Sequence, residues 1–331
     1  MRHDTTLKKI SQILDISIST VSRALKNHPD ISEKTKQKVL DLANTLEYEP
    51  NAYAINLRTN NSKIFGVIVP TVSYFFYDTF ISSLEEECKK NGYSLMILQS
   101  GDNTETETEN IKICRHNRVS GVFACITPNT TDIQPFLKLD ESDIPLIFFD
   151  KVPSYEACNK ICVADAQAAK TAAELIIQKK KKRVVGFFGN EKLSITQKRL
   201  PAFTEIFKRS NAAINLETDF ALSFEEAYKK TILYLNSKNK PDTFFCMSDE
   251  ILAGVIKAIQ KSDLKIPKDV SVVAISNGII PKLYYPEITY VETSGYKLGK
   301  LAFSHMIACI AGNTFVQELT IESVLVEGGS I

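Results

Sequence analysis

The sequence predicts a small all-α unit followed by a much larger α/β unit with two lobes. Two observations predict this fold class. Short amphipathic segments fill the first 48 residues, whereas beyond Lys63 continuous apolar runs of strand length alternate with helical segments. Strands that are apolar throughout are typical of parallel sheets covered by helices on both faces. A chain of 331 residues can build two or three such domains with sizeable cores.

The N-terminal segments predict three short helices. Apolar residues at helical spacing indicate a helix over 7–14, and a three-residue turn leads to a second helix over 17–25 that Ser17 can cap. Two short helices joined by such a turn form a helix-turn-helix. A third helix that starts after Ser32 can close the core.

The helix over 17–25 has an apolar face and a face of hydroxyls with one arginine. The polar face suits the major groove of DNA, where base edges and phosphates need donors and acceptors. The alternative is an ordinary surface helix. Charge favours DNA, because residues 1–63 carry ten basic against seven acidic side chains, while the remainder has a net charge of −2.

Residues 50–62 separate the two units. Pro50 is well placed early in a short helix over 50–58, which is too short and polar to be stable alone. A helix of this kind orders against a partner and can serve as a hinge. The alternative is a flexible linker. The polar stretch from Thr59 to Ser62 indicates a domain boundary.

The remainder alternates strands and helices in two sets. The expected strands are 64–69, 94–98, 121–125, 145–149, 183–188, 243–247 and 270–275, with a last strand-like run at 320–326. The expected helices are 82–91, 107–117, 166–178, 199–209 and 250–262, with a link near 155–163. Two such sets predict two similar lobes. Ligands of open α/β sheets bind outside the carboxyl ends of the strands, so the cleft between the lobes is the expected ligand site.

Motifs along nearly the whole chain resemble those of bacterial transcriptional regulators of the lactose-repressor type, the LacI/GalR family. Among them are Ser19-Thr-Val-Ser-Arg-Ala-Leu25, Tyr48-x-Pro50-Asn51, Gly66-Val-Ile-Val-Pro70, Pro145-Leu-Ile-Phe-Phe-Asp150, Asp249-Glu250 and Ile266-Pro-Lys-Asp-Val-Ser-Val-Val273. Each motif is weak alone, and their order and spacing together are specific.

The resemblance implies three domains and a function. It implies a helix-turn-helix DNA-binding domain over 1–49, a hinge helix and linker over 50–62, and a periplasmic-binding-protein-like effector domain over 63–331. The N-lobe would comprise about 63–161 plus 292–319, and the C-lobe about 162–291 plus 320–331. The implied function is that of a homodimeric regulator of transcription, a repressor or, less often, an activator. Its affinity for double-stranded operator DNA would be controlled by a small effector, a sugar or sugar derivative, bound between the lobes.

Carried over by motif, the DNA-binding residues are Thr6, Ser17, Ile18, Ser19, Thr20, Ser22, Arg23, Tyr48, Asn51, Ala54 and Leu57. Ile18 and Ser19 would choose among operators, although helix packing is the alternative role for Ile18. Leu57 would enter a central base step in the minor groove and kink the duplex, as apolar wedges do.

The candidate effector residues are Tyr74, Phe75, Phe76, Asp150, Lys151, Arg199, Asp249 and Ser276. Here the chain departs from the family, because Tyr74-Phe-Phe-Tyr77 stands where many members have Asn-Pro-Phe-Phe. A sugar would use carboxylates and an aromatic face, whereas an anionic ligand would favour Arg199 and Lys151. The sequence does not choose between them. For Asp150 and Asp249, capping of a neighbouring helix is the alternative role.

Other function classes lack their sequence signatures. A periplasmic sugar-binding protein would need a signal peptide, and no signal peptide or membrane span is visible, so we expect a cytoplasmic protein with no membrane partner. An enzyme would need a catalytic or cofactor motif. The chain has no G-x-G-x-x-G after its first strand, no phosphate-binding loop and no H-E-x-x-H. Its seven cysteines form no C-x-x-C pair and its four histidines are scattered, so we expect neither a cofactor nor a metal.

Overall fold

The structure is a computed structural model that describes residues 6–48, 62–210, 212–313 and 315–331. The chain divides into two compact units, Met1–Ser62 and Lys63–Ile331. Within the described residues, no helix is long and apolar enough to cross a membrane. The predicted hinge helix over 50–58 falls outside these residues.

The first unit is the predicted bundle of three helices, α1 (Leu7–Leu14), α2 (Ile18–Leu25) and α3 (Glu33–Thr45). Each helix begins with a hydroxyl cap. Thr6 accepts from the amide of Lys9, Ser17 from that of Thr20, and Ser32 from that of Thr35. The core consists of Ile10, Val21, Ala24, Val39 and Ala43.

Sheet A, the N-lobe sheet, has six parallel strands in the order β11-β5-β4-β3-β1-β2. These are β1 (Ile64–Val69), β2 (Ser94–Gln99), β3 (Gly121–Ala124), β4 (Leu146–Phe149), β5 (Asn159–Val163) and β11 (Glu318–Ile321). Helices α5 (Phe75–Lys90) and α13 (Gly295–Ile310) cover one face. The other face carries α6 (Thr104–His116) and α7 (Gln134–Leu137), followed by the short turn η1 (Asp140–Ser142). Both faces are therefore buried, as the apolar strands predict.

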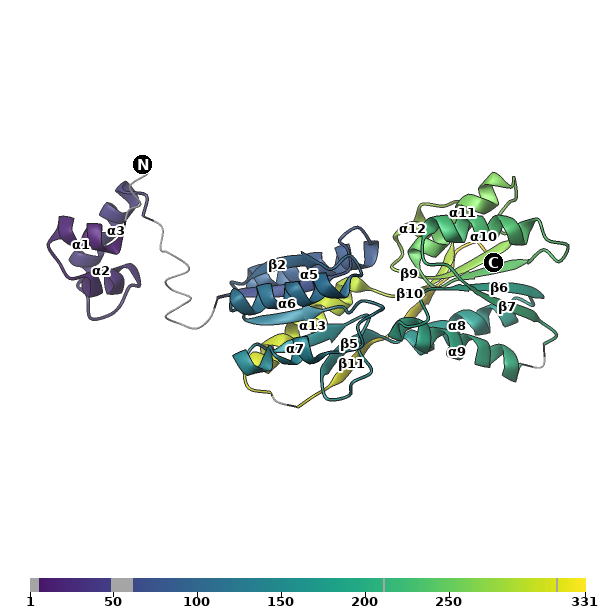
Figure 1. Cartoon of the computed structure of the whole chain (residues 1–331). Coiled ribbons are helices and arrows are strands. Elements are labelled where there is room, and N and C mark those ends of the chain that lie inside the picture. The colour runs from purple at the N-terminus through teal and green to yellow at the C-terminus, as the bar shows by residue number, and fades with distance from the viewer. Residues whose placement is uncertain (1–5, 49–61, 211, 314) are drawn as a thin grey trace. The chain divides into compact units, whose positions relative to one another are not determined.

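Sheet B, the C-lobe sheet, has the order β12-β10-β9-β8-β6-β7. Its strands are β6 (Arg183–Phe188), β7 (Asn215–Phe220), β8 (Thr243–Cys246), β9 (Ser271–Ser276), β10 (Thr289–Glu292) and β12 (Val324–Val326), and its helices are α8 (Asp165–Gln178), α9 (Ser194–Arg209), α10 (Phe224–Leu235), α11 (Asp249–Lys261) and α12 (Ile279–Lys282). Helices α8 and α9 lie on one face, and α10 and α11 on the other (Figure 1). Only the β10–β12 pair, among the described strands, is antiparallel.

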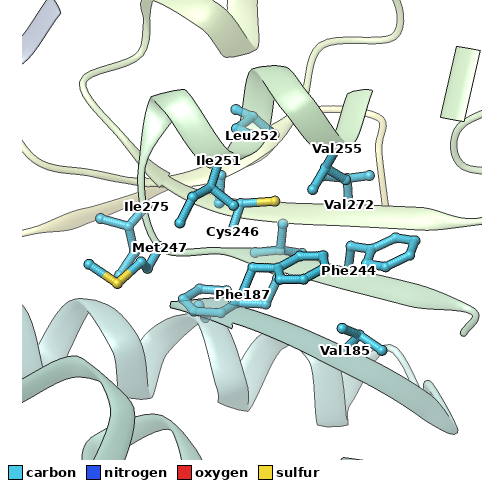
Figure 2. Packing of buried hydrophobic residues seen from close by; sticks show 14 of the residues in the cluster. Val185, Phe187, Phe244, Cys246, Met247, Ile251, Leu252, Val255, Val272 and Ile275 are labelled. Carbon is cyan, nitrogen blue, oxygen red and sulfur yellow. The ribbon is translucent and has the colours of Figure 1, made fainter. Parts of the chain in front are cut away.

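The core under α11 is built from both β-strand and helix side chains. Figure 2 shows Ile251, Leu252 and Val255 of α11 above Phe244 and Cys246 of β8. This packing fixes the start of α11 over the end of β8, and it thereby positions the residues that join them.

Four sequence expectations need correction. The link near 155–163 contains a strand, β5, and the run 320–326 is two strands that belong to different sheets. Helix α5 begins at Phe75 rather than 82. The sequence did not reveal this start because the cap residue Tyr74 makes no side-chain hydrogen bond, and so no capping signal precedes the helix. Helix α9 likewise begins at Ser194 rather than 199, behind Leu193, another cap residue without a side-chain hydrogen bond.

Seven elements were not predicted at all: β7, α10, β10 and α13, together with the short α7, η1 and α12. Strand β7 is an edge strand with the polar sequence Asn-Leu-Glu-Thr-Asp-Phe, so it lacks the apolar run that marks a buried strand. The chain crosses from sheet A to sheet B after β5, returns after β10, and crosses again between β11 and β12.

Gly254 sets the approach of α11 to α10. A Cβ at this position would lie 2.5 Å from the carbonyl oxygen of Phe224 and 2.8 Å from the Cβ of Ala227. We predict that Gly254→Ala lowers the free energy of unfolding by about 1–3 kcal/mol despite the better helix propensity of alanine. Urea unfolding of the full chain measures it. Lys261→Ala, at an exposed position of the same helix, is the control, and equal stability of the two variants would contradict the close packing.

Candidate functional site

The outer face of α2 forms a polar surface on the helical unit. Ser17, Ile18, Ser19 and Arg23 are exposed, and Thr20 and Ser22 are half-buried. Ile18 is 47% exposed and stays outside the core cluster, so the packing role considered for it does not apply. The two positions expected to choose among operators are therefore free to contact another molecule.

The hydroxyls of α2 interact with one another. The Ser17 oxygen accepts from the Thr20 amide at 3.0 Å and lies 2.7 Å from the Ser19 oxygen and 2.8 Å from the Thr20 oxygen. Arg23 lies 3.7 Å from Asp30, and because both side chains are well exposed this pair leaves the guanidinium available. The helix thus presents a row of hydroxyls next to one cation.

The other DNA-binding candidates are divided. Thr6 is exposed and caps α1, whereas Tyr48 is half-buried against the helical core, and burial raises its pKa. Asn51, Ala54 and Leu57 lie outside the described residues, so their minor-groove role stays a prediction.

A cavity of about 350 Å³ lies between the two sheets. Its N-lobe wall comes from the segments after β1, β2, β3 and β4, and its C-lobe wall from those after β6, β7 and β8. Its lining residues are Tyr74, Phe76, Tyr77, Asp102, Pro128, Asn129, Asp150, Lys151, Gly189, Asn190, Leu193, Ile195, Arg199, Ala221, Leu222, Met247, Ser248, Asp249, Glu250, Ile251, Ile275 and Thr293. This is the place where parallel α/β sheets bind ligands.

Six of the eight predicted effector residues line this cavity: Tyr74, Phe76, Asp150, Lys151, Arg199 and Asp249. Phe75 does not line it and is 39% exposed on the first turn of α5. Ser276 does not line it either, because it is buried beneath Asp249. The sequence places these two residues correctly near the cleft but does not reveal which way they face.

Asp150 follows β4 in a left-handed backbone conformation with φ +57°. Its Oδ2 accepts from the buried Tyr77 hydroxyl at 2.8 Å, while no hydrogen bond to Oδ1 is found among the described residues. Burial, followed by the charge of Asp150, raises the pKa of Tyr77 well above its ordinary value. Tyr77 therefore stays protonated and orients the carboxylate toward the cavity.

Lys151 is 8% exposed, and its ammonium has neither a hydrogen bond nor a salt bridge to any residue that the structure describes. It lies 5.8 Å from the centre of the Tyr77 ring. Burial alone would lower its pKa, but Cys125, Asp102 and Asp150 raise it, and the net shift is upward. The cavity thus holds a charged ammonium that can donate to a ligand.

Arg199 has its guanidinium engaged within the C-lobe. Nε and Nη2 both lie 2.7 Å from Oδ1 of Asp165, and Nη1 donates to the carbonyl of Met247 at 2.6 Å. Burial raises the pKa of Asp165 to about 6, against the opposing charge of Arg199. Sequence reasoning missed Asp165, although an acidic residue directly after an apolar strand is a signal that could have found it.

Asp249 is likewise engaged. One oxygen accepts from the Ser276 hydroxyl, and the other from the Asn277 amide at 3.1 Å. Burial raises its pKa to about 6. The carboxylate of Asp249 thus holds the turn after β9 against the start of α11, which is a structural role but not the capping of a neighbouring helix considered for it.

Glu107 was also missed. It is buried on α6, where Oε1 accepts from the Thr127 amide at 2.8 Å and Oε2 from the Thr130 hydroxyl at 2.6 Å. These bonds position the loop that carries Asn129 into the cavity. No local pattern marks Glu107, because its partners are 20 and 23 residues away in the sequence.

Direct contacts join the lobes beside the cavity. Lys192 donates to Asn129 at 3.1 Å, and the Val152 amide donates to Ser194 at 3.0 Å. An ion pair of 2.9 Å connects Lys198 on α9 with Glu318 on β11. Opening or closing of the lobes would have to change these contacts.

Comparison with known proteins agrees with both units. Residues 6–51 match the model of bacterial regulatory proteins of the lacI family, and residues 173–331 match that of the periplasmic binding protein-like domain. The HTH-type transcriptional repressor PurR of Vibrio vulnificus (strain CMCP6) is 24% identical over 304 residues, or 91% of each chain.

Solved structures share the fold. The Lac repressor dimer bound to operator and the anti-inducer ONPF has a TM-score of 0.87 at 20% identity and covers 98% of each chain. The complex of the transcriptional regulator CelR with cellobiose has a TM-score of 0.71 at 18% identity, covering 99% of this chain and 100% of that one. These relatives are transcriptional regulators rather than enzymes, and the chain belongs to the lacI family of bacterial regulatory proteins.

Proposed function

We propose that this chain is a homodimeric transcriptional repressor whose operator affinity is set by a small effector, a sugar or sugar derivative, bound between its lobes. One observation carries the proposal. A single chain combines the exposed hydroxyl and arginine face of α2 with an enclosed, charged cavity at the carboxyl ends of two parallel sheets. The relative named as the repressor PurR supports repression rather than activation, and the cellobiose complex of CelR supports a sugar as the effector. Such a protein acts in the cytoplasm, where its operator lies.

The mechanism follows from differential binding. An effector that contacts both walls of the cavity stabilises one arrangement of the lobes over the other. The lobe arrangement in turn biases the segment over 50–58, where Asn51, Ala54 and Leu57 are the proposed minor-groove residues. Effector and operator then change each other's affinity by the same factor.

We expect the full chain to select a roughly palindromic site from genomic DNA fragments, with affinity that falls steeply with salt. Fluorescence anisotropy titrations of the selected site at several salt concentrations measure this affinity. Metabolites that raise the melting temperature should also change the anisotropy titration. If the chain selects no DNA site, either alone or with a metabolite extract, the proposal is wrong.

Arg23 and Ser19 should act differently on operator binding. Arg23→Ala is expected to weaken binding to all sequences, because it removes a phosphate contact. For the same reason, the slope of the logarithm of the binding constant against the logarithm of the salt concentration should fall by about one per subunit. Ser19→Ala is expected to change the preference at one base pair per half-site by about 1–3 kcal/mol. Titrations against operator variants at several salt concentrations separate the two. Lys38→Ala, at an exposed position on α3, controls for simple loss of charge. If Arg23→Ala and Ser19→Ala both weaken binding equally for all operator sequences, these roles are wrong.

The C-lobe carries an apolar surface suited to a second copy of the chain. A shallow hollow of about 210 Å³ is lined by the apolar residues Phe224, Ile256, Ile280, Leu283 and Tyr284. Of these, Leu283 is 77% exposed. Exposed apolar patches mark interaction sites, and a two-fold dimer uses the same patch of both subunits. A dimer also matches a palindromic operator.

Leu283→Glu is therefore expected to weaken dimerisation by at least about 30-fold, since a charge would replace an apolar contact of both subunits. Sedimentation analysis over a range of concentrations measures the dissociation constant. Leu233→Glu is the matched control, because Leu233 is 71% exposed on α10 and does not line the hollow. Equal effects of the two changes would place the dimer contact elsewhere.

A further inference from the structure

The end of sheet B at which its parallel strands start is strongly basic. Three neighbouring strands, β9, β8 and β6, start there, and the segments 262–270, 236–242 and 179–183 lead into them. These segments carry nine basic side chains against three acidic ones, whereas the net charge of the whole chain is only +1. Eight of the nine are exposed, and we call them the basic surface: Lys179, Lys180, Lys182, Arg183, Lys238, Lys240, Lys265 and Lys268.

Hydrogen bonds join the three segments. Nζ of Lys181 donates to the hydroxyl of Ser271 at 2.7 Å, which connects the segment before β6 with the start of β9. Nε of Arg183 donates to the carbonyl oxygen of Lys240 at 2.6 Å, which connects the same segment with the one before β8. Because neighbouring strands lie about 4.8 Å apart, the cations form one continuous surface rather than three separate loops.

The acidic side chains of these segments mainly hold the backbone. Oδ2 of Asp242 accepts from the amides of Lys182 and Arg183 at 2.9 and 3.0 Å. Oδ2 of Asp269 accepts from the amide of Lys265 at 2.8 Å. These bonds fix the loops that carry the cations.

The cations of the basic surface form no ion pairs. Elsewhere an exposed lysine such as Lys90 pairs with Glu86 at 2.7 Å, but no salt bridge between described residues involves any of the eight. The other nearby carboxylates are Asp263 and, before the next strand β10, Glu287. The surface therefore keeps an excess of positive charge, and a bound polyanion would relieve the repulsion within it.

We infer that the basic surface binds the phosphate backbone of duplex DNA outside the operator, without reading its sequence. Runs of lysine and arginine suit closely spaced phosphates, and duplex DNA carries one negative charge per about 1.7 Å of its axis. Within these segments, all of which the structure describes, no large apolar side chain is exposed. The surface thus offers neither an aromatic platform for unpaired bases nor an apolar wedge for a lipid bilayer.

The basic surface is separate from the cavity. Cavity residues of the C-lobe follow the strands of sheet B, whereas the basic surface precedes them. A duplex and an effector would therefore not compete for the same side chains. A second DNA contact goes beyond the proposed operator recognition, because it would raise the effective concentration of DNA at the helical unit without adding sequence preference.

The test measures binding of the full chain to a labelled duplex of random sequence by fluorescence anisotropy at several salt concentrations. A chain that combines Lys179→Gln, Lys180→Gln and Lys182→Gln should bind at least about tenfold more weakly at low salt. The slope of the logarithm of the binding constant against the logarithm of the salt concentration should fall by about two to three, because each phosphate contact contributes about 0.9.

The matched control combines Lys89→Gln, Lys138→Gln and Lys229→Gln, which removes three exposed lysines outside the basic surface. This control should bind within about twofold of the parent chain. A second variant, Lys265→Gln with Lys268→Gln, changes the segment before β9 and should lower the slope by about one to two. Unchanged melting temperatures confirm that the variants are folded.

Arg23→Ala separates this contact from that of α2. In the Arg23→Ala chain the three lysine changes should weaken binding by the same factor as in the parent, because distant, independent sites are additive. The inference is overturned if the lysine variant binds as its matched control does, or if its effect disappears in the Arg23→Ala chain. It is also overturned if polyglutamate displaces the labelled duplex as well as unlabelled duplex of equal charge does. Failure to select an operator would refute the proposed function but not this inference, because the probe contains no operator.

Discussion

Every charged side chain that folding buries between the lobes needs a partner, and this requirement organises the cleft. Parallel strands bring polar residues to one edge of each sheet, where Asp150 follows β4 and Asp249 follows β8. Desolvation would be costly for an isolated charge at such positions. The chain meets this cost with short, fixed contacts, Tyr77 to Asp150 in one lobe and Asp165 to Arg199 in the other. Lys151 is the exception, because its buried ammonium has no hydrogen bond or salt bridge to any described residue and is therefore available to a ligand.

The same contacts connect the site with the rest of each lobe. Asp249 joins α11 to the turn after β9, and Arg199 joins α9 to α8 and to the end of β8. A ligand that touches these side chains therefore contacts the ends of several elements at once. Movement of one lobe against the other would carry whole sheets rather than single loops, which is how closely packed interiors respond to a small displacement.

Sequence reasoning located the cleft but not the state of its side chains. The strands β1, β4, β6 and β8 are continuous apolar runs, so their positions and their carboxyl ends follow from local pattern alone. Polar strand β7 and the uncapped start of α5 carry no such signal, and both were missed. Ser276 and Phe75 were chosen by position near the cleft, and only tertiary packing decides that one is buried below Asp249 and the other faces outward. Helix α2 was easier, because its cap, its apolar face and its polar face all lie within nine consecutive residues.

The α2 surface is built from one continuous segment, whereas the cavity is built from many segments. For this reason the family resemblance is more informative about the DNA-binding residues than about the effector-binding residues. The α2 surface is made by one short segment, so a motif match transfers its geometry almost completely. The cavity is made by residues at the ends of strands in both sheets, and each contact within a lobe changes which neighbouring group is left for a ligand. Arg199 and Asp249 match the family pattern, yet their main hydrogen bonds are internal, whereas Leu222 and Ile251 match no ligand motif and nevertheless line the cavity. Ligand class therefore has to be derived from the lining groups that have no partner within their own lobe, and among the described residues the ammonium of Lys151 is one of these.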